Sequence, residues 1–400
     1  MNATGASSEA VALPAAGERA APYPAQIDSL TSLRFLAASW VVFFHLREYT
    51  HSIAVLNSPM MTFGYLGVDF FFVLSGFVLT HVYKRDVDAG RFNYWGFISK
   101  RFGRIYPMHL ATLAAFIVLG AVSSRLGFAY SIWDPSAPFQ MERGAFFRGL
   151  ITHLTLIQAW GSTDGLLFNL PSWSISAEWF AYLIFPIYML VFRRFRVGPL
   201  IQLAAAALIF VVMAAVCNVG MRLNLTAMTW NVGILRIFPE FLLGVGLYNF
   251  GQRWSAGALG ARIGFGLSGV LVLLALFAAG ADERLVGAST AVAVLGLAGL
   301  VLFAADATRA GAFRMMSAPF LVLLGEISYS VYMLHLLVGI VVFDLVTPAF
   351  RPASAVGAIA AICGMLALIT FLSWLSYRLI EVPGRRAVVG WARQLDRPAE

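Results

Sequence analysis

The chain has 400 residues, of which 60% are apolar and 12% carry a charge. Soluble domains carry about 25% charged residues, so this composition excludes an ordinary soluble protein and indicates a polytopic membrane protein. The net charge is +8, but the basic residues lie in short segments between apolar runs, where membrane topology accounts for them, and they indicate no nucleic-acid partner.

The first segment, 1–26, is rich in Ala, Glu and Pro and lacks the basic start and apolar stretch of a signal peptide. We interpret it as a flexible cytoplasmic tail. Ten apolar runs follow, each close to the roughly 20 residues that a helix needs to cross a bilayer. The predicted spans are 30–47, 64–83, 104–122, 174–192, 199–219, 231–250, 262–281, 285–304, 318–343 and 355–379.

The predicted fold is therefore an all-α membrane helix bundle, with one transmembrane domain over 27–383 and a short cytoplasmic tail over 384–400. One further segment, 146–160, is shorter than a span and contains arginine, threonine, histidine and glutamine. With ten spans and the N-terminus inside, most basic residues between spans face the cytoplasm, as the positive-inside rule requires. An eleventh crossing at 146–160 would reverse every later loop. We therefore expect an interfacial or re-entrant helix there and both termini in the cytoplasm.

Ionisable residues within spans are costly and mark candidate functional sites. Arg34 and His45 are eleven residues apart. This spacing is about 16 Å along a helix and close to three turns, so both side chains project from nearly one face. His45 lies near the predicted outer end of its span. Asp69, Glu178 and His335 are predicted at a similar depth in other spans, so these four side chains are expected to form one layer.

Basic residues gather at the predicted inner face. Lys100, Arg101 and Arg104 open a predicted helix at the depth of Arg34. Positive charge beside a helix N-terminus suits a multiply anionic ligand. A structural interpretation stands beside this one, with the basic residues as membrane anchors and Asp69 as a helix cap or an ion-pair partner.

No metal site and no disulfide is predicted. Cys217 and Cys363 both lie within apolar runs, and no cysteine or histidine spacing matches a metal site. We expect His109 and His335 to be residues of the core or of a cavity wall.

Five segments together carry a resemblance to a known family. They are LTSLRFLAASWVVFFH, GYLGVDFFFVLSGFVL, RFGRIYP, LPSWSISAEWFAYLIFP and GEISYSVYMLH. In this order, between Ile27 and Pro383, the chain resembles the acyltransferase-3 family of bacterial membrane O-acyltransferases. The resemblance implies a transferase of the bacterial cytoplasmic (inner) membrane. Such an enzyme moves an acyl group, usually acetyl, from cytoplasmic acyl-CoA to a hydroxyl of a sugar, polysaccharide or small glycosylated product.

The resemblance also implies roles for individual residues. The catalytic histidine of the family matches His45. The residues that accompany it match Arg34, Arg101, Arg104 and Glu178. Many relatives have paired acids at the last of these positions, whereas Trp179 follows the glutamate in this chain.

A mechanism follows as a hypothesis. The phosphates of CoA would bind a cationic inner mouth formed by Arg34, Lys100, Arg101 and Arg104. The thioester would then reach His45, which would act as general base on the acceptor hydroxyl. Glu178 or Asp69 would orient the imidazole, as the third member of a catalytic triad does. Direct transfer and an acyl-histidine intermediate both fit this arrangement.

Two other classes of protein share some of these features. A secondary transporter or flippase also places charged residues within spans, but neither half of this chain repeats the other. A non-catalytic scaffold would use Arg34, His45 and Glu178 as a structural polar cluster. Two classes of acceptor fit: an exopolysaccharide or other glycan, and a macrolide-type secondary metabolite.

Overall fold

The computed structural model describes residues 21–49, 57–194, 197–347 and 354–395. Most of the tail expected at 1–26 lies outside these residues, as does the end of the tail expected at 384–400. The described residues form α-helices joined by short 3₁₀ and π segments and irregular loops, and none of them forms a strand. The predicted all-α fold is confirmed.

Each of the ten predicted spans coincides with a helix. These helices are α1 (Asp28–Leu46), α3 (Gly67–Asp88), α4 (Tyr94–Leu126), α6 (Trp173–Arg194), α7 (Pro199–Ala215), α8 (Gly233–Gly251), α9 (Gly257–Ala281), α10 (Val286–Arg309), α11 (Pro319–Gly339) and α12 (Ala355–Ser376). The other α-helices are α2 (Pro59–Thr62), α5 (Arg143–Leu154) and α13 (Val382–Leu395). The segment expected to be interfacial or re-entrant forms α5, whose 12 residues are too few to cross a bilayer.

Tighter and wider helical turns connect or extend these helices. The 3₁₀ segments are η1 (Arg47–Tyr49), η3 (Gly64–Leu66), η4 (Ala137–Gln140), η5 (Leu170–Ser172), η7 (Leu225–Ala227), η8 (Glu283–Leu285) and η9 (Arg314–Ser317). The π segments are η6 (Val216–Gly220), η10 (Ile340–Val346) and η11 (Tyr377–Glu381). Single π turns within helices frequently occur at functional sites.

Within the described residues, nine helices are long and apolar enough to cross a membrane. The remaining predicted span, 231–250, forms α8. Arg236 and Glu240 lower the mean hydropathy of this helix, which leaves it outside the nine. Both charged side chains are buried, and α8 packs against α3, α6, α7 and α10. A helix surrounded by protein in this way does not need an apolar surface on every side.

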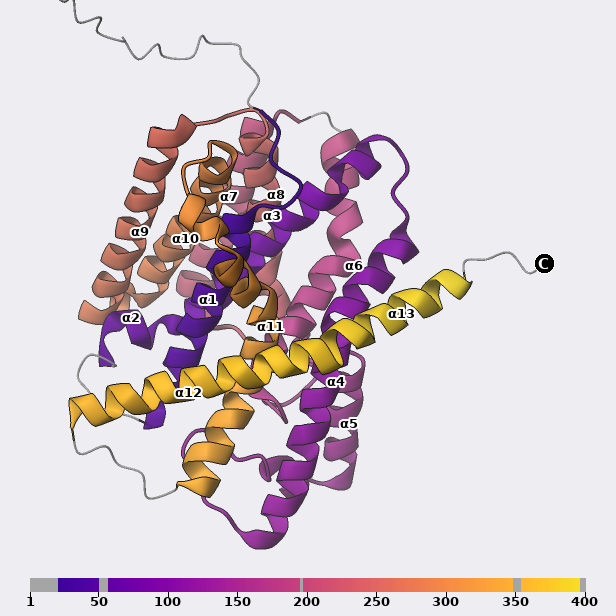
Figure 1. Cartoon of the computed structure of the whole chain (residues 1–400), viewed down its shortest axis with the longest axis vertical. Helices are drawn as coiled ribbons and strands as arrows, with labels where there is room; N and C mark the ends of the chain where they lie inside the picture. Colours follow the sequence, from indigo (N-terminus) through magenta and orange to yellow (C-terminus); the bar gives the residue numbers. More distant parts are fainter. Residues whose placement is uncertain (1–20, 50–56, 195–196, 348–353, 396–400) are drawn as a thin grey trace, which may run out of the picture.

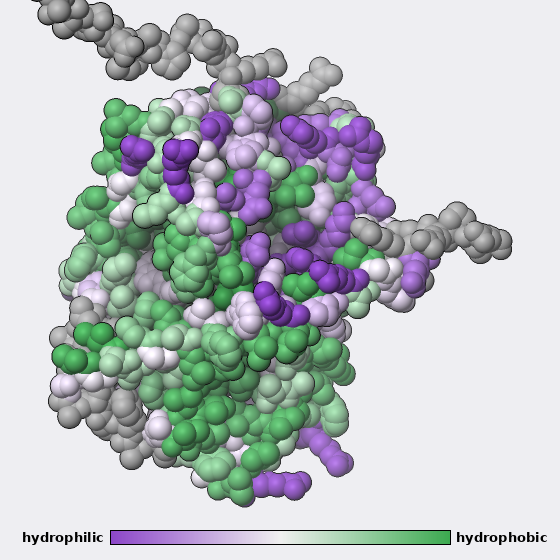
Figure 2. Space-filling model, viewed as in Figure 1, coloured by the Kyte–Doolittle hydropathy of each residue, from purple (hydrophilic) through white to green (hydrophobic). Residues whose placement is uncertain are grey.

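One long helical rod crosses the flank of the bundle (Figure 1). It consists of α12, η11 and α13, and it packs against α11 and α4. Figure 2 shows an apolar surface over the lower part of the same face, with hydrophilic residues gathered above it. An exposed apolar surface of this extent is expected where a protein is surrounded by lipid.

Glycines allow the helices around the site to approach closely. A Cβ atom at Gly325 of α11 would collide with the carbonyl of Thr31 in α1, and one at Gly76 of α3 would collide with the carbonyl of Phe241 in α8. Small residues at such contacts let helix backbones meet in membrane bundles. As a result, α1 and α11 lie side by side over their length, with Thr31 beside Gly325 near one end.

Candidate active site

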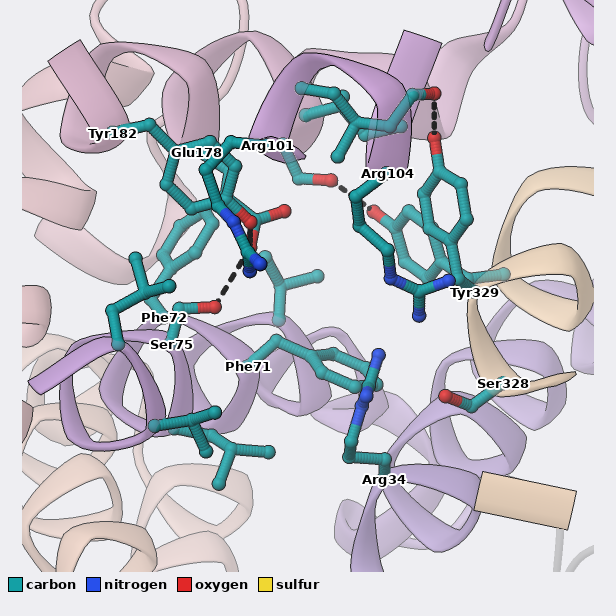
Figure 3. A pocket seen from close by; sticks show the side chains of 18 residues that line it. Arg34, Phe71, Phe72, Ser75, Arg101, Arg104, Glu178, Tyr182, Ser328 and Tyr329 are labelled. Atoms are coloured by element: carbon teal, nitrogen blue, oxygen red, sulfur yellow. Dashed lines mark hydrogen bonds between the residues drawn. The ribbon is translucent and has the colours of Figure 1, made fainter. Parts of the chain in front are cut away.

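A cavity of about 130 Å³ lies where α1, α3, α4, α6 and α11 converge. We call it the cationic cavity because Arg34, Arg101 and Arg104 lie in its wall. In Figure 3 the guanidinium groups of Arg34 and Arg104 approach the same space from opposite sides, and Glu178 extends into it beside Arg101. The three arginines that the sequence analysis assigned to the donor therefore meet, although they come from two helices.

The fourth basic residue of that prediction lies elsewhere. Lys100 is exposed and is absent from the cavity wall. The expectation that Lys100, Arg101 and Arg104 open a helix was also wrong. The helix begins at Tyr94, because the side chain of Asn93 accepts a hydrogen bond from the Gly96 amide at 2.9 Å and caps it there. The arginines thus lie inside α4, and the N-terminus of this helix does not contribute charge to the cavity.

Arg104 has a buried partner that the sequence analysis missed. Glu381, at the end of η11, forms an ion pair with Arg104 and accepts a hydrogen bond from the Ser330 hydroxyl at 2.9 Å. Its side chain is only 1% exposed. The sequence did contain a signal for this pair. Glu381 lies just after the last predicted span, on the same predicted side of the membrane as the basic cluster.

Glu178 lies in the cationic cavity and not in a layer with His45, so that expectation was wrong. It accepts hydrogen bonds from the hydroxyls of Ser75, at 2.8 Å, and Tyr182, at 2.5 Å. The reason is the path of the chain before α6. Asn169 is buried and donates to the carbonyl of Met333 at 3.2 Å, so α6 begins inside the bundle rather than at its surface.

A second cavity, of about 240 Å³, lies beside the first. We call it the histidine cavity, since His45 lies in its wall together with apolar and aromatic side chains. Val68 and Tyr332 line both cavities. The Tyr332 hydroxyl is held by hydrogen bonds to the Pro171 carbonyl, at 3.1 Å, and to the Ser174 hydroxyl, at 2.8 Å. These contacts fix the boundary between the cavities.

His45 meets His335 across the contact of α1 and α11. Nδ1 of His45 lies 3.0 Å from the Val41 carbonyl and 3.2 Å from Nε2 of His335. Nδ1 of His335 lies 2.6 Å from the Tyr332 carbonyl. The predicted placement of these two histidines at one depth is therefore correct. Of the other two members of that layer, Glu178 lies in the cationic cavity, and Asp69 is bonded to Arg236 in the wall of the histidine cavity.

Asp69 is bonded to an arginine and not to His45. Nε and Nη2 of Arg236 donate to its two carboxylate oxygens at 3.0 and 2.5 Å, and both side chains are almost fully buried. Arg236 also lines the histidine cavity, and its guanidinium lies over the ring of Trp173. Arg236 was not predicted as a site residue, although an arginine within a predicted span marks a candidate functional position.

The described part of the chain contains no candidate metal site. No group of three or more His, Cys, Asp or Glu side chains lies close enough there to hold a metal ion.

Comparison with known proteins shows the family of the chain. The profile of the acyltransferase-3 family, described as an acyltransferase domain, matches residues 27–378. The chain belongs to this family. The chain is 30% identical over 339 residues to acyltransferase MdmB of Streptomyces mycarofaciens. The aligned region covers 79% of the chain and 80% of that protein. No solved structure matches the chain.

Two further relatives widen the comparison. The acyltransferase is 24% identical over 392 residues to O-acetyltransferase OatA of Staphylococcus aureus, which covers 91% of the chain and 58% of that protein. It is 31% identical over 164 residues to protein 2 in the picA locus of Rhizobium radiobacter, which covers 39% of the chain and 78% of that protein. The recognition made from five sequence segments is confirmed, and the protein is a multi-pass membrane acyltransferase.

Proposed function

We propose that this acyltransferase moves an acyl group, acetyl in the simplest case, from cytoplasmic acyl-CoA to a hydroxyl of a glycan such as an exopolysaccharide. One observation carries the proposal. A single helix, α1, places Arg34 in the wall of the cationic cavity and His45 in the wall of the histidine cavity, and the two cavities share Val68 and Tyr332. This arrangement suits a long donor with phosphates at one end and a reactive thioester at the other.

The cationic cavity would hold the phosphate end of the donor. Arg34, Arg101 and Arg104 offer guanidinium groups that suit phosphate geometry. Glu381 holds Arg104 in place, and Glu178 lies among the arginines. We leave Lys100 out of the donor site because its side chain is exposed and lies away from the cavity.

The histidine cavity would be the place of reaction. The ring of His45 takes the proton of the acceptor hydroxyl, and the oxygen attacks the thioester carbonyl. A C–O bond forms, the C–S bond breaks, and the thiolate of CoA leaves and receives the proton from His45. An acyl-histidine intermediate would use the same ring nitrogen as a nucleophile. Asp69 would act indirectly by holding Arg236 in the cavity wall.

The acceptor would enter the histidine cavity beside aromatic side chains. Phe44, Tyr65 and Trp173 lie in its wall and suit stacking against a sugar ring. A sugar hydroxyl on a macrolide-type metabolite would fit the same wall, and a glycan extract separates the two acceptors. We place the enzyme in the bacterial cytoplasmic membrane, with the donor bound from the cytoplasm.

The test is release of free CoA from acetyl-CoA by the purified protein in nanodiscs, with and without a glycan extract from the host. We expect extract-dependent release by the wild type and none by His45→Ala. The matched control is His109→Ala, because His109 is also a buried histidine but lies in the wall of neither cavity. Equal release by wild type and His45→Ala would refute the role of His45. Solute transport without CoA release would favour a transporter.

A further inference from the structure

We infer that His335 is a positioning residue for His45: together with the Val41 carbonyl it accepts the Nδ1–H of the catalytic imidazole, and it stabilises the charge that the imidazole gains during transfer. The inference rests on the proposed function, in which His45 is the base. Neither the family resemblance nor the sequence motifs assigned a role to His335, which the sequence analysis placed in the core or a cavity wall.

Backbone carbonyls determine which nitrogens carry protons. A carbonyl oxygen only accepts hydrogen bonds, so a ring nitrogen beside one must carry a hydrogen. Nδ1 of His45 lies 3.0 Å from the Val41 carbonyl, and Nδ1 of His335 lies 2.6 Å from the Tyr332 carbonyl. Both neutral rings are therefore protonated on Nδ1. Nε2 of His335 is then an acceptor, and it lies 3.2 Å from Nδ1 of His45.

The pair leaves one nitrogen of His45 free for chemistry. Its Nδ1–H is shared between the Val41 carbonyl and Nε2 of His335. Nε2 of His45 is then unprotonated, and His45 lies in the wall of the histidine cavity, where this nitrogen is left for a ligand. The Val41 carbonyl alone already favours this tautomer, so His335 contributes a second acceptor that holds the orientation of the ring.

His335 also suits the charged state of the cycle. When Nε2 of His45 takes the hydroxyl proton, the ring becomes an imidazolium, and its Nδ1–H bond to His335 becomes charge-assisted and stronger. A carboxylate performs this task in serine hydrolases. In this protein Asp69 is bonded to Arg236 and Glu178 to Ser75 and Tyr182, so a neutral imidazole occupies that position.

The surroundings of His335 distinguish it from a histidine that only fills space. Its side chain is 1% exposed. The close contact of α1 and α11 at Gly325 brings its ring to His45, with the ring centroids 4.9 Å apart. His109 is equally buried, but its Nε2 donates to the His153 carbonyl at 2.9 Å and it contacts neither cavity. His109 therefore provides a matched control.

The experiment measures kcat and KM for acetyl-CoA in His335→Phe, His335→Gln and His109→Phe. Phenylalanine keeps a ring but removes the acceptor, so we expect kcat to fall at least about 100-fold with little change in KM. Glutamine places a carbonyl oxygen near the position of Nε2, so we expect it to recover at least about tenfold of that loss. His109→Phe should retain the kcat of the wild type.

Several outcomes would overturn the inference. An unchanged kcat in His335→Phe would do so, as would equal losses in the phenylalanine and glutamine variants, because packing alone would then explain them. If either of these results occurs while wild type releases CoA and His45→Ala does not, the inference fails and the proposed function stands. An inactive wild type refutes the proposed function itself. If His335→Phe does not fold, ¹⁵N chemical shifts of the wild-type histidines decide, and a His45 protonated on Nε2 would refute the inference.

Discussion

The ion pair of Asp69 and Arg236 gives a prediction about stability that can be worked from the structure. Both side chains are at most 1% exposed, and two hydrogen bonds join them. Removing one partner of a buried pair costs about 3–5 kcal/mol. Two charge-assisted hydrogen bonds at about 1.5–3 kcal/mol each give about 3–6 kcal/mol, which overlaps this range. We therefore expect Asp69→Ala to lower the free energy of unfolding by about 3 kcal/mol or more.

The assay is equilibrium unfolding in mixed micelles for a double-mutant cycle. Asp69→Ala and Arg236→Met are measured singly and together, and the double variant should cost less than the sum of the two, since it leaves no unpaired charge between them. Additive effects, or single losses below about 1 kcal/mol, would refute the reasoning. A variant that keeps its stability but loses transfer would instead support the orienting role first expected of Asp69.

Two other predictions concern the cavities. Arg101→Gln should weaken acetyl-CoA binding about tenfold, which corresponds to about 1.4 kcal/mol. Lys100→Gln should change the affinity little, because that side chain lies outside the cavity wall. Calorimetry on both variants checks this, and equal losses of affinity would contradict it. Val68→Phe should leave the affinity for free CoA near that of wild type but lower the transfer rate about 100-fold, because Val68 lies in the shared wall and a larger ring would keep the thioester from His45. Loss of both affinity and transfer in Val68→Phe would show that the donor does not follow this path.

The sequence predicted the spanning helices and α5, but not α2 or α13, and most of α13 lies in the segment expected to be a tail. Apolar runs near 20 residues located the ten spanning helices, and the loop charges separated the short helix α5 from the spans. The start of α4 was predicted ten residues late. The apolar run begins near Arg104, whereas the helix begins where Asn93 caps it. Hydropathy records which residues face lipid, and it does not record hydrogen bonds at a helix end.

Within the site, residues on one helix were predicted better than residues on different helices. Arg34 and His45 share α1, so helical geometry alone related them, and each lines a cavity. The depth of Glu178 depended on the loop before α6, which enters the bundle through the buried Asn169. No periodicity in the sequence describes the path of an irregular loop.

Partners far apart in the chain were the hardest to predict. Glu381 reaches Arg104 because η11 is a π segment, which changes the direction of side chains relative to a regular helix. Arg236 meets Asp69 where Gly76 and Gly244 let α3 and α8 approach. Both pairs depend on tertiary packing, which a single sequence without packing information does not supply.

The pairing of α3 with α8 also has a consequence for how the polypeptide is inserted during synthesis. Asp69 and Arg236 lie near the starts of α3 and α8, so each costs less at the translocon than the about 2.5–3.5 kcal/mol of a charged residue at the centre of a span. Asp69 leaves the ribosome well before Arg236, so it enters the bilayer before the cation that neutralises it exists. The pairing with α3 offsets the cost of Arg236, so we expect α3 to favour the transfer of α8 into lipid. For this helix, membrane integration and tertiary docking are therefore coupled.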